Sequence, residues 1–365
     1  MQHPATLMRS WQWEGFGDLS HLRLRSVPVP VPGPKEVLVR LRASSLNRRD
    51  VMVAQGVPVG KPLRIGLIPL SDGAGEIIAV GEGVSRVEPG ERVAATFRQG
   101  WMDGYGYSAD AVYDLGGGLD GTLREYAVFD EQGLVRIPDH LGYEEAATLP
   151  CAAVTAWNAV MSKGVLHPGE VVLTQGSGGV SLFAVQFARL AGARVIATTS
   201  DNIKAERLRS LGASDVVNYR EHTRWSEEVL RLTGGRGVDL VVEIGGPGTL
   251  VESIRSAREG GRVVLVGLLT GAQRRESPEA PAARRGETGF DADTSGAFVS
   301  AFLRDTTITS VHVGHRRSFE EMNRAIGNSQ LHPVIDRAFD FDRAPEAYAH
   351  LMSGAHFGKV VINHG

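Results

Sequence analysis

Closely spaced glycines after an apolar, β-branched segment form the motif of this chain that is best suited to binding a ligand. The apolar segment 171–175 is followed by Gly-x-Gly-Gly-x-Ser, in which Ser181 stands where the usual dinucleotide fingerprint has its third glycine. The helix that follows would present free N–H groups and partial positive charge, and glycines let phosphate groups approach the backbone. An ordinary strand-to-helix turn is the alternative for this stretch alone. The residues that we expect to cradle a pyrophosphate are Gly176, Ser177, Gly178, Gly179 and Val180.

The position that contacts the adenosine ribose distinguishes NAD from NADP. An NAD site usually has Asp or Glu at the end of the second strand, about 20 residues beyond the glycines, where the carboxylate accepts from the 2′-hydroxyl. Here that position is Thr199, followed by Ser200, and Lys204 comes one helical turn later. Hydroxyl groups and a cation suit a 2′-phosphate, which a carboxylate would repel. We therefore expect NADP(H) as the cofactor; the alternative is that Lys204 is an ordinary solvated helix residue.

Strand and helix patterns alternate along the chain beyond the glycines. In the segment 180–190, apolar residues recur at i, i+3, i+4 and i+7, which is typical of one face of a helix. Strands that alternate with helices predict a doubly wound parallel sheet with right-handed crossovers. The further strands are expected at 193–199, 215–217, 238–243 and 261–267, and the further helices at 204–211 and 250–257.

Short strand patterns separated by proline and glycine turns fill the chain before the glycine motif. Residues 36–42 alternate between apolar and polar types, as a half-buried strand does, and 26–34 is expected to be an extended, proline-rich link. The three glycines 116–118 are expected in a loop. Many short strands of this kind predict a β-rich, barrel-like domain. The other strands are expected at 71–81, 92–96, 122–129 and 133–137.

The composition of the chain limits the classes of protein to which it can belong. Its 365 residues leave room for two domains, and its net charge of −3 gives no electrostatic case for a nucleic-acid or membrane-surface partner. The single cysteine, Cys151, excludes an intramolecular disulfide. We expect neither a signal peptide nor a membrane-spanning run, and hence a cytoplasmic protein.

Five segments of the chain match a known family in content and order. They are Ser45–Asp50, Pro69–Gly75, Glu145–Trp157, Gly176–Val180 and His356–Ile362. In these segments the chain resembles the medium-chain dehydrogenase/reductase superfamily, specifically its zinc-independent, quinone oxidoreductase-like branch. The resemblance implies an α/β fold in which a GroES-like, β-rich barrel domain is followed by a Rossmann domain with a doubly wound parallel sheet. The GroES-like substrate domain would comprise residues 1–145, completed by 315–365, and the NADP-binding Rossmann domain would comprise 146–314.

Zinc-dependent members of this superfamily hold a catalytic metal with a Cys, a His and a second Cys. In this sequence Asn47 and Ser71 match the first two positions, and Asp72 stands where those members have a glutamate. Cys151 alone remains, and one thiolate cannot hold a tetrahedral zinc site. We therefore expect no bound metal, so hydrogen-bond donors must stabilise the charge that develops during hydride transfer. Acceptors that delocalise this charge, such as quinones and α,β-unsaturated carbonyls, would be the easier substrates.

The resemblance thus implies a zinc-independent, NADPH-dependent oxidoreductase that transfers hydride to a quinone or an α,β-unsaturated carbonyl. Two alternatives stay open, because no residue of these motifs is an evident proton donor. One is an enoyl reductase or alcohol dehydrogenase-like tailoring enzyme of a biosynthetic pathway, and the other is a non-catalytic NADPH-binding sensor. The expected partners are a small-molecule substrate and a second copy of the chain, bound through the last Rossmann strand at 307–313.

Two further parts of the chain follow from the resemblance and the composition. The polar stretch 273–295 is expected to be a surface insertion or a lid over the substrate cleft. Helices at 319–327 and 345–353 and a strand at 359–362 would return to the first domain.

Four residues are the catalytic candidates. The amide of Asn47 offers donors and an acceptor, suited to fixing the nicotinamide ribose or the substrate oxygen. Arg48 stands where family members often have tyrosine and could stabilise an enolate, with a surface arginine as the alternative. Asp50 is expected to orient this loop and Asp72 to form a hydrogen bond in the cleft. Further cofactor contacts are expected from Asn47, Thr155, Thr199, Ser200, Lys204, Tyr219, Gly245, Val266, Gly267, Leu268, Val313 and Lys359.

Overall fold

The chain forms two compact units, each with hydrophobic clusters of its own. The first unit comprises Met1–Val154 and Val313–Gly365, and the second comprises Thr155–His312. In the described part of the chain, no helix is both long enough and apolar enough to cross a membrane. The computed structural model describes residues 6–58, 62–104, 113–267 and 292–365.

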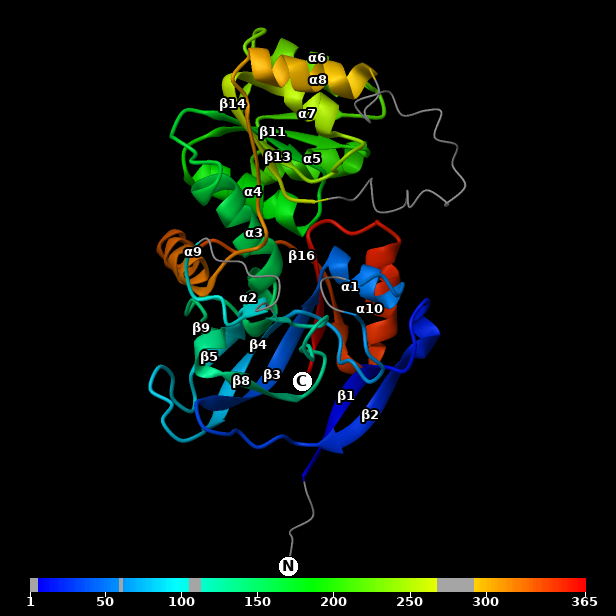
Figure 1. Ribbon diagram of the computed structural model, residues 1–365, viewed down its shortest axis with the longest axis vertical. Coiled ribbons are helices and arrows are strands. Elements are labelled where there is room, and N and C mark those ends of the chain that lie inside the picture. Colours follow the sequence, from blue (N-terminus) through cyan, green and yellow to red (C-terminus); the bar gives the residue numbers. More distant parts are fainter. Residues whose placement is uncertain (1–5, 59–61, 105–112, 268–291) are drawn as a thin grey trace, which may run out of the picture. The chain divides into compact units, whose positions relative to one another are not determined.

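A six-stranded parallel sheet forms the centre of the second unit (Figure 1). Its strands are β10 (Val171–Gln175), β11 (Arg194–Thr199), β12 (Asp215–Asn218), β13 (Val238–Glu243), β14 (Ala257–Leu265) and β15 (Thr307–Ser310). Their order in the sheet is β12-β11-β10-β13-β14-β15, so the direction of winding reverses between β10 and β13. The predicted doubly wound parallel sheet is confirmed.

Helices connect these strands. In α4 the side chains of Phe183, Phe187 and Ala188 are buried, as the periodic pattern predicted. Residues 273–291 of the predicted polar stretch 273–295 lie outside the described part of the chain. The remaining residues of that stretch begin helix α8, which was not predicted. The helical segments of this part are α3 (Val154–Trp157), a π-helical turn at Asn158–Ser162, α4 (Gly179–Leu190), α5 (Asn202–Leu211), α6 (Trp225–Leu232), α7 (Leu250–Ser256) and α8 (Ala292–Leu303).

Strand β13 is buried along its whole length, as expected for a central strand of a parallel sheet. It nevertheless contains a carboxylate near each end. Asp239 accepts hydrogen bonds from Arg236 (2.7 Å), from Arg258 (2.5 Å) and from the backbone N–H of Val171 (2.8 Å). Two guanidinium groups therefore compensate its buried charge, and the bond from the Val171 N–H connects β13 to the start of β10. Glu243, at the other end, belongs to the candidate site below.

Short strands build the first unit. They are β1 (Leu7–Trp13), β2 (Leu22–Pro28), β3 (Glu36–Leu46), β4 (Asp72–Val80), β5 (Arg92–Ala95), β6 (Arg98–Gln99), β7 (Tyr113–Asp114), β8 (Tyr126–Asp130), β9 (Leu134–Arg136), β16 (Ile335–Asp340) and β17 (Lys359–Asn363). The main sheet has the order β16-β17-β3-β4-β5-β9, and β8 also pairs with β3. The β-rich architecture predicted for this part of the chain is confirmed.

The last strand of the chain, β17, lies between the edge strand β16 and β3. β17 pairs in parallel with β16 and antiparallel with β3, so that Val360 lies opposite Leu46. This register brings Lys359 to the end of β3, where the first helix begins. Among the described residues of this unit, the helical segments are α1 (Arg48–Ala54), α2 (Tyr143–Ala146), a π-helical turn at Leu149–Ala153, α9 (Arg316–Ser329) and α10 (Ala344–Met352), besides three short 3₁₀ turns.

Some boundaries differ from the predictions. The predicted link 26–34 is partly wrong, because β2 runs to Pro28 and pairs with β1. Strand β8 begins at Tyr126 rather than at Thr122, whose backbone N–H donates instead to Leu70. Strand β15 ends at Ser310, three residues earlier than predicted. β1 and β16 were not predicted. Each becomes recognisable as a strand only through pairing with its partner, which is β2 for β1 and β17 for β16.

Candidate active site

The glycine turn joins β10 to α4 at the point where the winding of the sheet reverses. Gly176 has φ of 75°, a left-handed conformation that favours glycine. Gly178 is the N-cap of α4, and no side chain caps the helix. A methyl group added at Gly178 would meet no atom within 4 Å, so the space over the helix N-terminus is open. Open space above uncapped N–H groups fits the pyrophosphate of a dinucleotide.

Ser181, which replaces the third glycine of the fingerprint, has a structural role. Its side chain is buried, and its hydroxyl donates a hydrogen bond of 2.6 Å to the carbonyl of Gln175. This bond ties the first turn of α4 to the end of β10. The substitution therefore braces the turn and leaves the open space above Gly178 unchanged.

A buried polar network, which the sequence analysis missed, joins the ends of β10 and β13. Gln175 accepts from the backbone N–H groups of Ile244 (3.0 Å) and Gly245 (3.1 Å), and its Nε2 donates to Glu243 at 2.7 Å. Thr249 also donates to Glu243, at 2.5 Å. Glu243 is completely buried, and these donors satisfy its oxygens. The network fixes the loop containing Gly245 beside the glycine turn. The available signal was a polar residue at the end of each apolar strand.

The predicted 2′-phosphate residues lie at the ends of β11 and β12. The backbone N–H of Tyr219 donates to the carbonyl of Thr199 at 3.0 Å, and the Tyr219 side chain is 42% exposed. Ser200 follows directly on β11 and Lys204 lies in the first turn of α5. Arg220, which was not predicted, follows Tyr219 and is exposed.

One carboxylate in this region, that of Asp201, caps the N-terminus of a helix. Asp201 caps α5 and accepts from the backbone N–H groups of Ile203 (2.7 Å) and Lys204 (3.0 Å). The hydrogen bond from Lys204 and the positive charges of Lys204 and Arg220 hold the pKa of Asp201 below its usual range. The Asp201 carboxylate is therefore engaged in capping, and Lys204 and Arg220 bring positive charge to this region.

The other predicted cofactor residues are placed as follows. Gly245 lies against the side chain of Thr249, which leaves no room for a larger residue. Val266 and Gly267 follow β14, and Leu268 lies outside the described part of the chain. Thr155 is buried in α3. Val313 has φ of 52°, which is unusual for a β-branched residue.

A cluster of buried polar side chains forms in the first unit, at the end of β3. The ammonium group of Lys359 donates to the Leu46 carbonyl at 2.7 Å and to Oδ1 of Asn47 at 2.5 Å, and it lies 3.8 Å from Asp72. Lys359 is only 3% exposed, so these contacts replace its hydration. Its predicted contact with the cofactor stays a prediction, and the contacts that the structure shows are these.

Asp72 is the carboxylate of this cluster and is completely buried. Its oxygens accept from the hydroxyl of Ser71 at 3.0 Å and from the backbone N–H of Cys151 at 3.3 Å. Burial raises the pKa of Asp72, whereas the nearby Lys359 ammonium acts in the opposite direction. Burial, with the Asp72 charge as a smaller cause, likewise raises the pKa of the Cys151 thiol.

The three charged residues that follow Asn47 occupy different environments. Asp50 is buried, and its Oδ2 accepts from the backbone N–H of Asn47 at 2.7 Å, as expected for a residue that orients this loop. Burial raises the pKa of Asp50 to about 7. Arg49 donates to the Leu115 carbonyl at 2.6 Å. Arg48 is exposed, and the structure shows no contact between it and the cluster of Asn47, Asp72 and Lys359.

At the three positions that match the zinc ligands of zinc-dependent members, this chain thus has the amide of Asn47, the hydroxyl of Ser71 and the thiol of Cys151. Among the residues that the structure describes, no three His, Cys, Asp or Glu side chains are grouped so that they could hold a metal ion. The cationic group beside Asp72 is the ammonium of Lys359. The donor set of Asn47 and Ser71 is hard and neutral, and it does not fit the nitrogen and sulfur coordination that zinc prefers.

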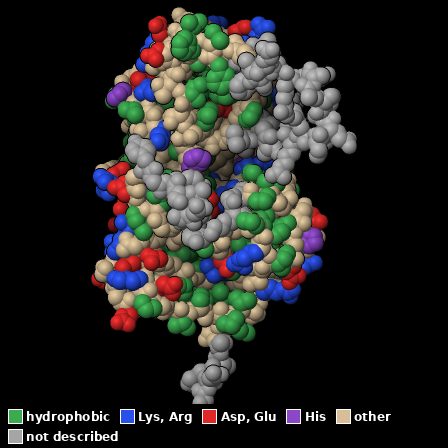
Figure 2. Space-filling view, viewed as in Figure 1, with side chains coloured by type: hydrophobic (Ala, Val, Ile, Leu, Met, Phe, Trp, Pro, Cys, Tyr) green, Lys and Arg blue, Asp and Glu red, His purple; other side chains and the backbone are tan. Residues whose placement is uncertain are grey.

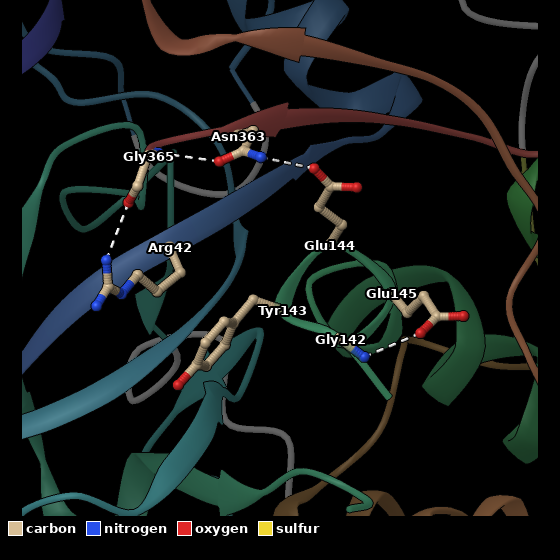
Figure 3. A pocket seen from close by; sticks show the side chains of 7 residues that line it. All are labelled: Arg42, Gly142, Tyr143, Glu144, Glu145, Asn363 and Gly365. Atoms are coloured by element: carbon tan, nitrogen blue, oxygen red, sulfur yellow. Dashed lines mark hydrogen bonds between the residues drawn. The ribbon is translucent and has the colours of Figure 1, made fainter. Parts of the chain in front are cut away.

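A pocket elsewhere on the first unit does not include these candidates (Figure 3). Its volume is about 490 Å³. Its polar groups bind one another: Asn363 donates to Glu144 at 2.8 Å, and Arg42 donates to the Gly365 carbonyl at 3.1 Å. Several polar groups of the lining are therefore already paired with one another.

Comparison with known proteins agrees with this arrangement. Residues 33–139 match the family described as alcohol dehydrogenase GroES-like domain, and residues 179–328 match the family described as zinc-binding dehydrogenase. A zinc-type alcohol dehydrogenase-like protein of Schizosaccharomyces pombe is 39% identical over 332 residues, which cover 90% of this chain and 91% of that protein. The human protein named quinone oxidoreductase is 26% identical, with 98% of each chain covered.

Solved structures show the same architecture. The crystal structure of a putative alcohol dehydrogenase from Sinorhizobium meliloti has a TM-score of 0.86 and 37% identity, and it covers 100% of both chains. The predicted combination of a GroES-like domain with a Rossmann domain is confirmed. The chain belongs to the medium-chain dehydrogenase/reductase superfamily, a group of oxidoreductases that bind a nicotinamide cofactor.

Proposed function

We propose that this protein is a zinc-independent, NADPH-dependent reductase that transfers a hydride to a quinone or an α,β-unsaturated carbonyl. One observation carries the proposal: the buried ammonium of Lys359 binds Asn47 and lies beside Asp72. The positive charge that a metal would supply at this place is thus built from the chain itself. The human relative named quinone oxidoreductase supports the choice of substrate class.

The protein groups then have defined tasks. When bound, the nicotinamide supplies the hydride. The amide nitrogen of Asn47 lies 3.4 Å from the hydroxyl of Ser71 and also bonds to Asp72, and we infer that it turns one N–H toward a substrate oxygen when substrate binds. Lys359 polarises that amide through its carbonyl oxygen. Hydrogen-bond donors of this kind suffice for acceptors that spread the negative charge over a conjugated system.

The preference for NADPH rests on the groups at the ends of β11 and β12. Lys204 and Arg220 bring two positive charges to this region, and Thr199 and Ser200 stand where an NAD site would have a carboxylate. Asp201 is committed to capping α5. A 2′-phosphate would therefore meet cations and hydroxyl groups.

We further propose a homodimer that forms through the edge of the second unit. Among the residues that the structure describes, β15 pairs with β14 alone and is the last strand of its sheet, so its other backbone edge has no strand partner there. On α8, Phe302 and Leu303 are 85% and 73% exposed. Figure 2 shows hydrophobic side chains on the surface in the upper part of the view, where Figure 1 labels α8. Light scattering should give twice the chain mass, and the double variant F302E/L303E should give the monomer mass.

The test of the reaction is the initial rate of NADPH oxidation by protein treated with EDTA. An ortho-quinone and a conjugated enone are compared as acceptors, and each assay is repeated with NADH. Turnover that prefers NADPH, with either acceptor, supports the proposal, and the better acceptor separates a quinone reductase from an enoyl reductase. Activity that returns only when zinc is added would contradict it. Tight NADPH binding without any turnover would instead support a sensor.

A further inference from the structure

The residue before Ser71 and Asp72 has a strained backbone. Leu70 has φ of 67° and is completely buried. The other non-glycine residues with positive φ in the described part of the chain are half-buried or exposed. A bulky side chain rarely adopts this conformation, and it persists only where the surroundings over-determine it.

The surroundings of Leu70 supply that constraint. The segment 120–123, which we call the splint, runs beside 68–70 and bonds to three consecutive carbonyl groups. The bonds are Gly121 N–H to Ile68 (2.7 Å), Thr122 N–H to Leu70 (2.9 Å) and Leu123 N–H to Pro69 (3.1 Å). In return, Asp120 accepts from the N–H of Ile68 at 3.0 Å.

Thr122 extends the splint across the strained residue. Its hydroxyl donates to the backbone carbonyl of Asp72 at 2.8 Å, and it accepts from the hydroxyl of Ser44 at 3.0 Å. Its N–H donates to the carbonyl of Leu70, so Thr122 binds both the residue before Ser71 and the residue after it. Thr122 and Ser44 are both completely buried, and water cannot replace these bonds.

Two glycines allow the close approach. A methyl group on Gly121 would overlap the backbone oxygens of Pro69 and Leu70. A methyl group on Gly116 would lie 2.7 Å from the carbonyl carbon of Leu70, far inside ordinary contact. The sequence predicted a loop at the glycines 116–118. In the structure the first of them, Gly116, allows the loop to approach the backbone of Leu70 closely.

We propose that the splint holds Leu70 in its strained conformation and thereby fixes Ser71 and Asp72 against Asn47, Lys359 and Cys151. Leu70, Gly121 and Thr122 are then positioning residues of the active site. The proposal deepens the proposed function and rests on it for its catalytic consequence. The geometric part has a readout that does not require turnover.

That readout is the single cysteine of the chain. The N–H of Cys151 donates to Asp72, so a displaced Asp72 would free the segment that contains the thiol. In Thr122→Val, which removes only the hydroxyl, the rate of Cys151 labelling by a disulfide reagent such as DTNB should rise about fivefold, the factor that corresponds to one lost buried hydrogen bond. In Thr122→Ser the hydroxyl is kept, and the labelling rate should return toward the wild-type value.

The catalytic consequence is measured in parallel. In Thr122→Val, kcat should fall about tenfold, and the Tm should fall by a few degrees because a buried hydrogen bond is lost. The Kd for NADPH should change much less than kcat, because the glycine turn expected to hold the pyrophosphate lies in the second unit. Both kcat and Tm should return toward wild-type values in Thr122→Ser. Gly121→Ala should show a larger loss, and Gly327→Ala, at a glycine of α9 with open space around it, should behave as wild type.

The outcomes separate the two proposals. If wild-type protein does not turn over any acceptor, the proposed function fails, and the labelling rates still decide whether the splint positions Asp72. If wild type turns over and Thr122→Val matches it in both kcat and labelling rate, the splint proposal is overturned. A labelling rate that rises equally in Thr122→Ser would overturn it as well, because the hydroxyl would then be irrelevant.

Discussion

The ammonium nitrogen of Lys359 lies 2.5 Å from Oδ1 of Asn47, although 312 positions separate the two residues in the sequence. The contact depends on β17 pairing with β3, which places the start of the last strand beside the end of the third. The same ammonium is the cationic partner of the buried Asp72. A lysine near the end of the chain therefore determines the electrostatics of a site whose other residues come from its first half.

Replacing Lys359 with methionine should expose this dependence. The K359M variant leaves Asp72 buried without its cation, which should lower the free energy of unfolding by about 3 kcal/mol. The D72N variant is the matched control, and the double variant should be more stable than the sum of the two single effects predicts. Urea denaturation measures all four proteins. Additive losses would show that the 3.8 Å separation between the two charges carries no energetic coupling.

The stability of the protein should depend on the protonation of Asp50. Its pKa is raised by burial from 3.8 to about 7, so the folded state binds a proton that the unfolded state releases between these values. The stabilisation that this bound proton gives to the folded protein is complete below the pKa that Asp50 has in the unfolded state. It is lost as the pH rises through the pKa that Asp50 has in the folded state. The neutral variant D50N, which keeps an acceptor for the Asn47 N–H, should therefore gain up to about 4 kcal/mol relative to wild type between pH 4 and pH 9. Urea midpoints at pH 5, 7 and 9 measure this, and a difference that is constant with pH would contradict it.

The variant Lys204→Ala, alone and with Arg220→Ala, should distinguish the two nicotinamide cofactors. Each lost contact with a 2′-phosphate should raise the KM for NADPH about tenfold and leave the KM for NADH nearly unchanged. Arg209→Ala is the control, because Arg209 lies on the same helix and pairs with Glu206. Equal effects on both cofactors would place Lys204 and Arg220 away from the 2′-phosphate.

The variant Gln175→Leu should weaken both cofactors equally. It leaves the N–H groups of Ile244 and Gly245 without their acceptor and loosens the loop beside the glycine turn. The Kd for NADPH and for NADH should each rise about tenfold, because the loop is common to both ligands. Fluorescence titration measures both constants. A selective effect on NADPH would contradict the structural role assigned to Gln175.

The parts of the fold that the sequence predicted well have local causes. β13 is rich in valine and leucine, and α4 repeats apolar residues at helical spacing after a glycine turn, so both were recognisable without a partner. β16 and β1 have no such signature. Each is stabilised by pairing with a strand that the pattern of its own residues does not reveal.

The candidate site divides in the same way. The places of the glycine turn and of the end of β11 could be predicted, because an apolar strand, closely spaced glycines and a helical pattern follow one another in the sequence. The role of these residues in binding a cofactor stays a prediction. Three contacts could not be predicted, because each joins residues that meet only once the chain has folded. They are the bond from Lys359 to Asn47, the hydrogen-bond network around Glu243 and the bond from Thr122 to Asp72. Arg48 and Arg49 are adjacent in the sequence, and only the structure shows that the second is the one turned inward.

The position of β17 between β16 and β3 also has a consequence for the order in which the protein is made. The whole second unit, residues 155–312, leaves the ribosome before β17 is synthesised, and all its strands are contiguous in that stretch. The first unit, whose synthesis begins earlier, must wait with an open gap in its sheet until Lys359–Asn363 emerge. In the nascent chain the second unit is therefore complete while the first is unfinished. The edges of β3 and β16 that later pair with β17 are the surfaces that a chaperone would have to protect during that interval.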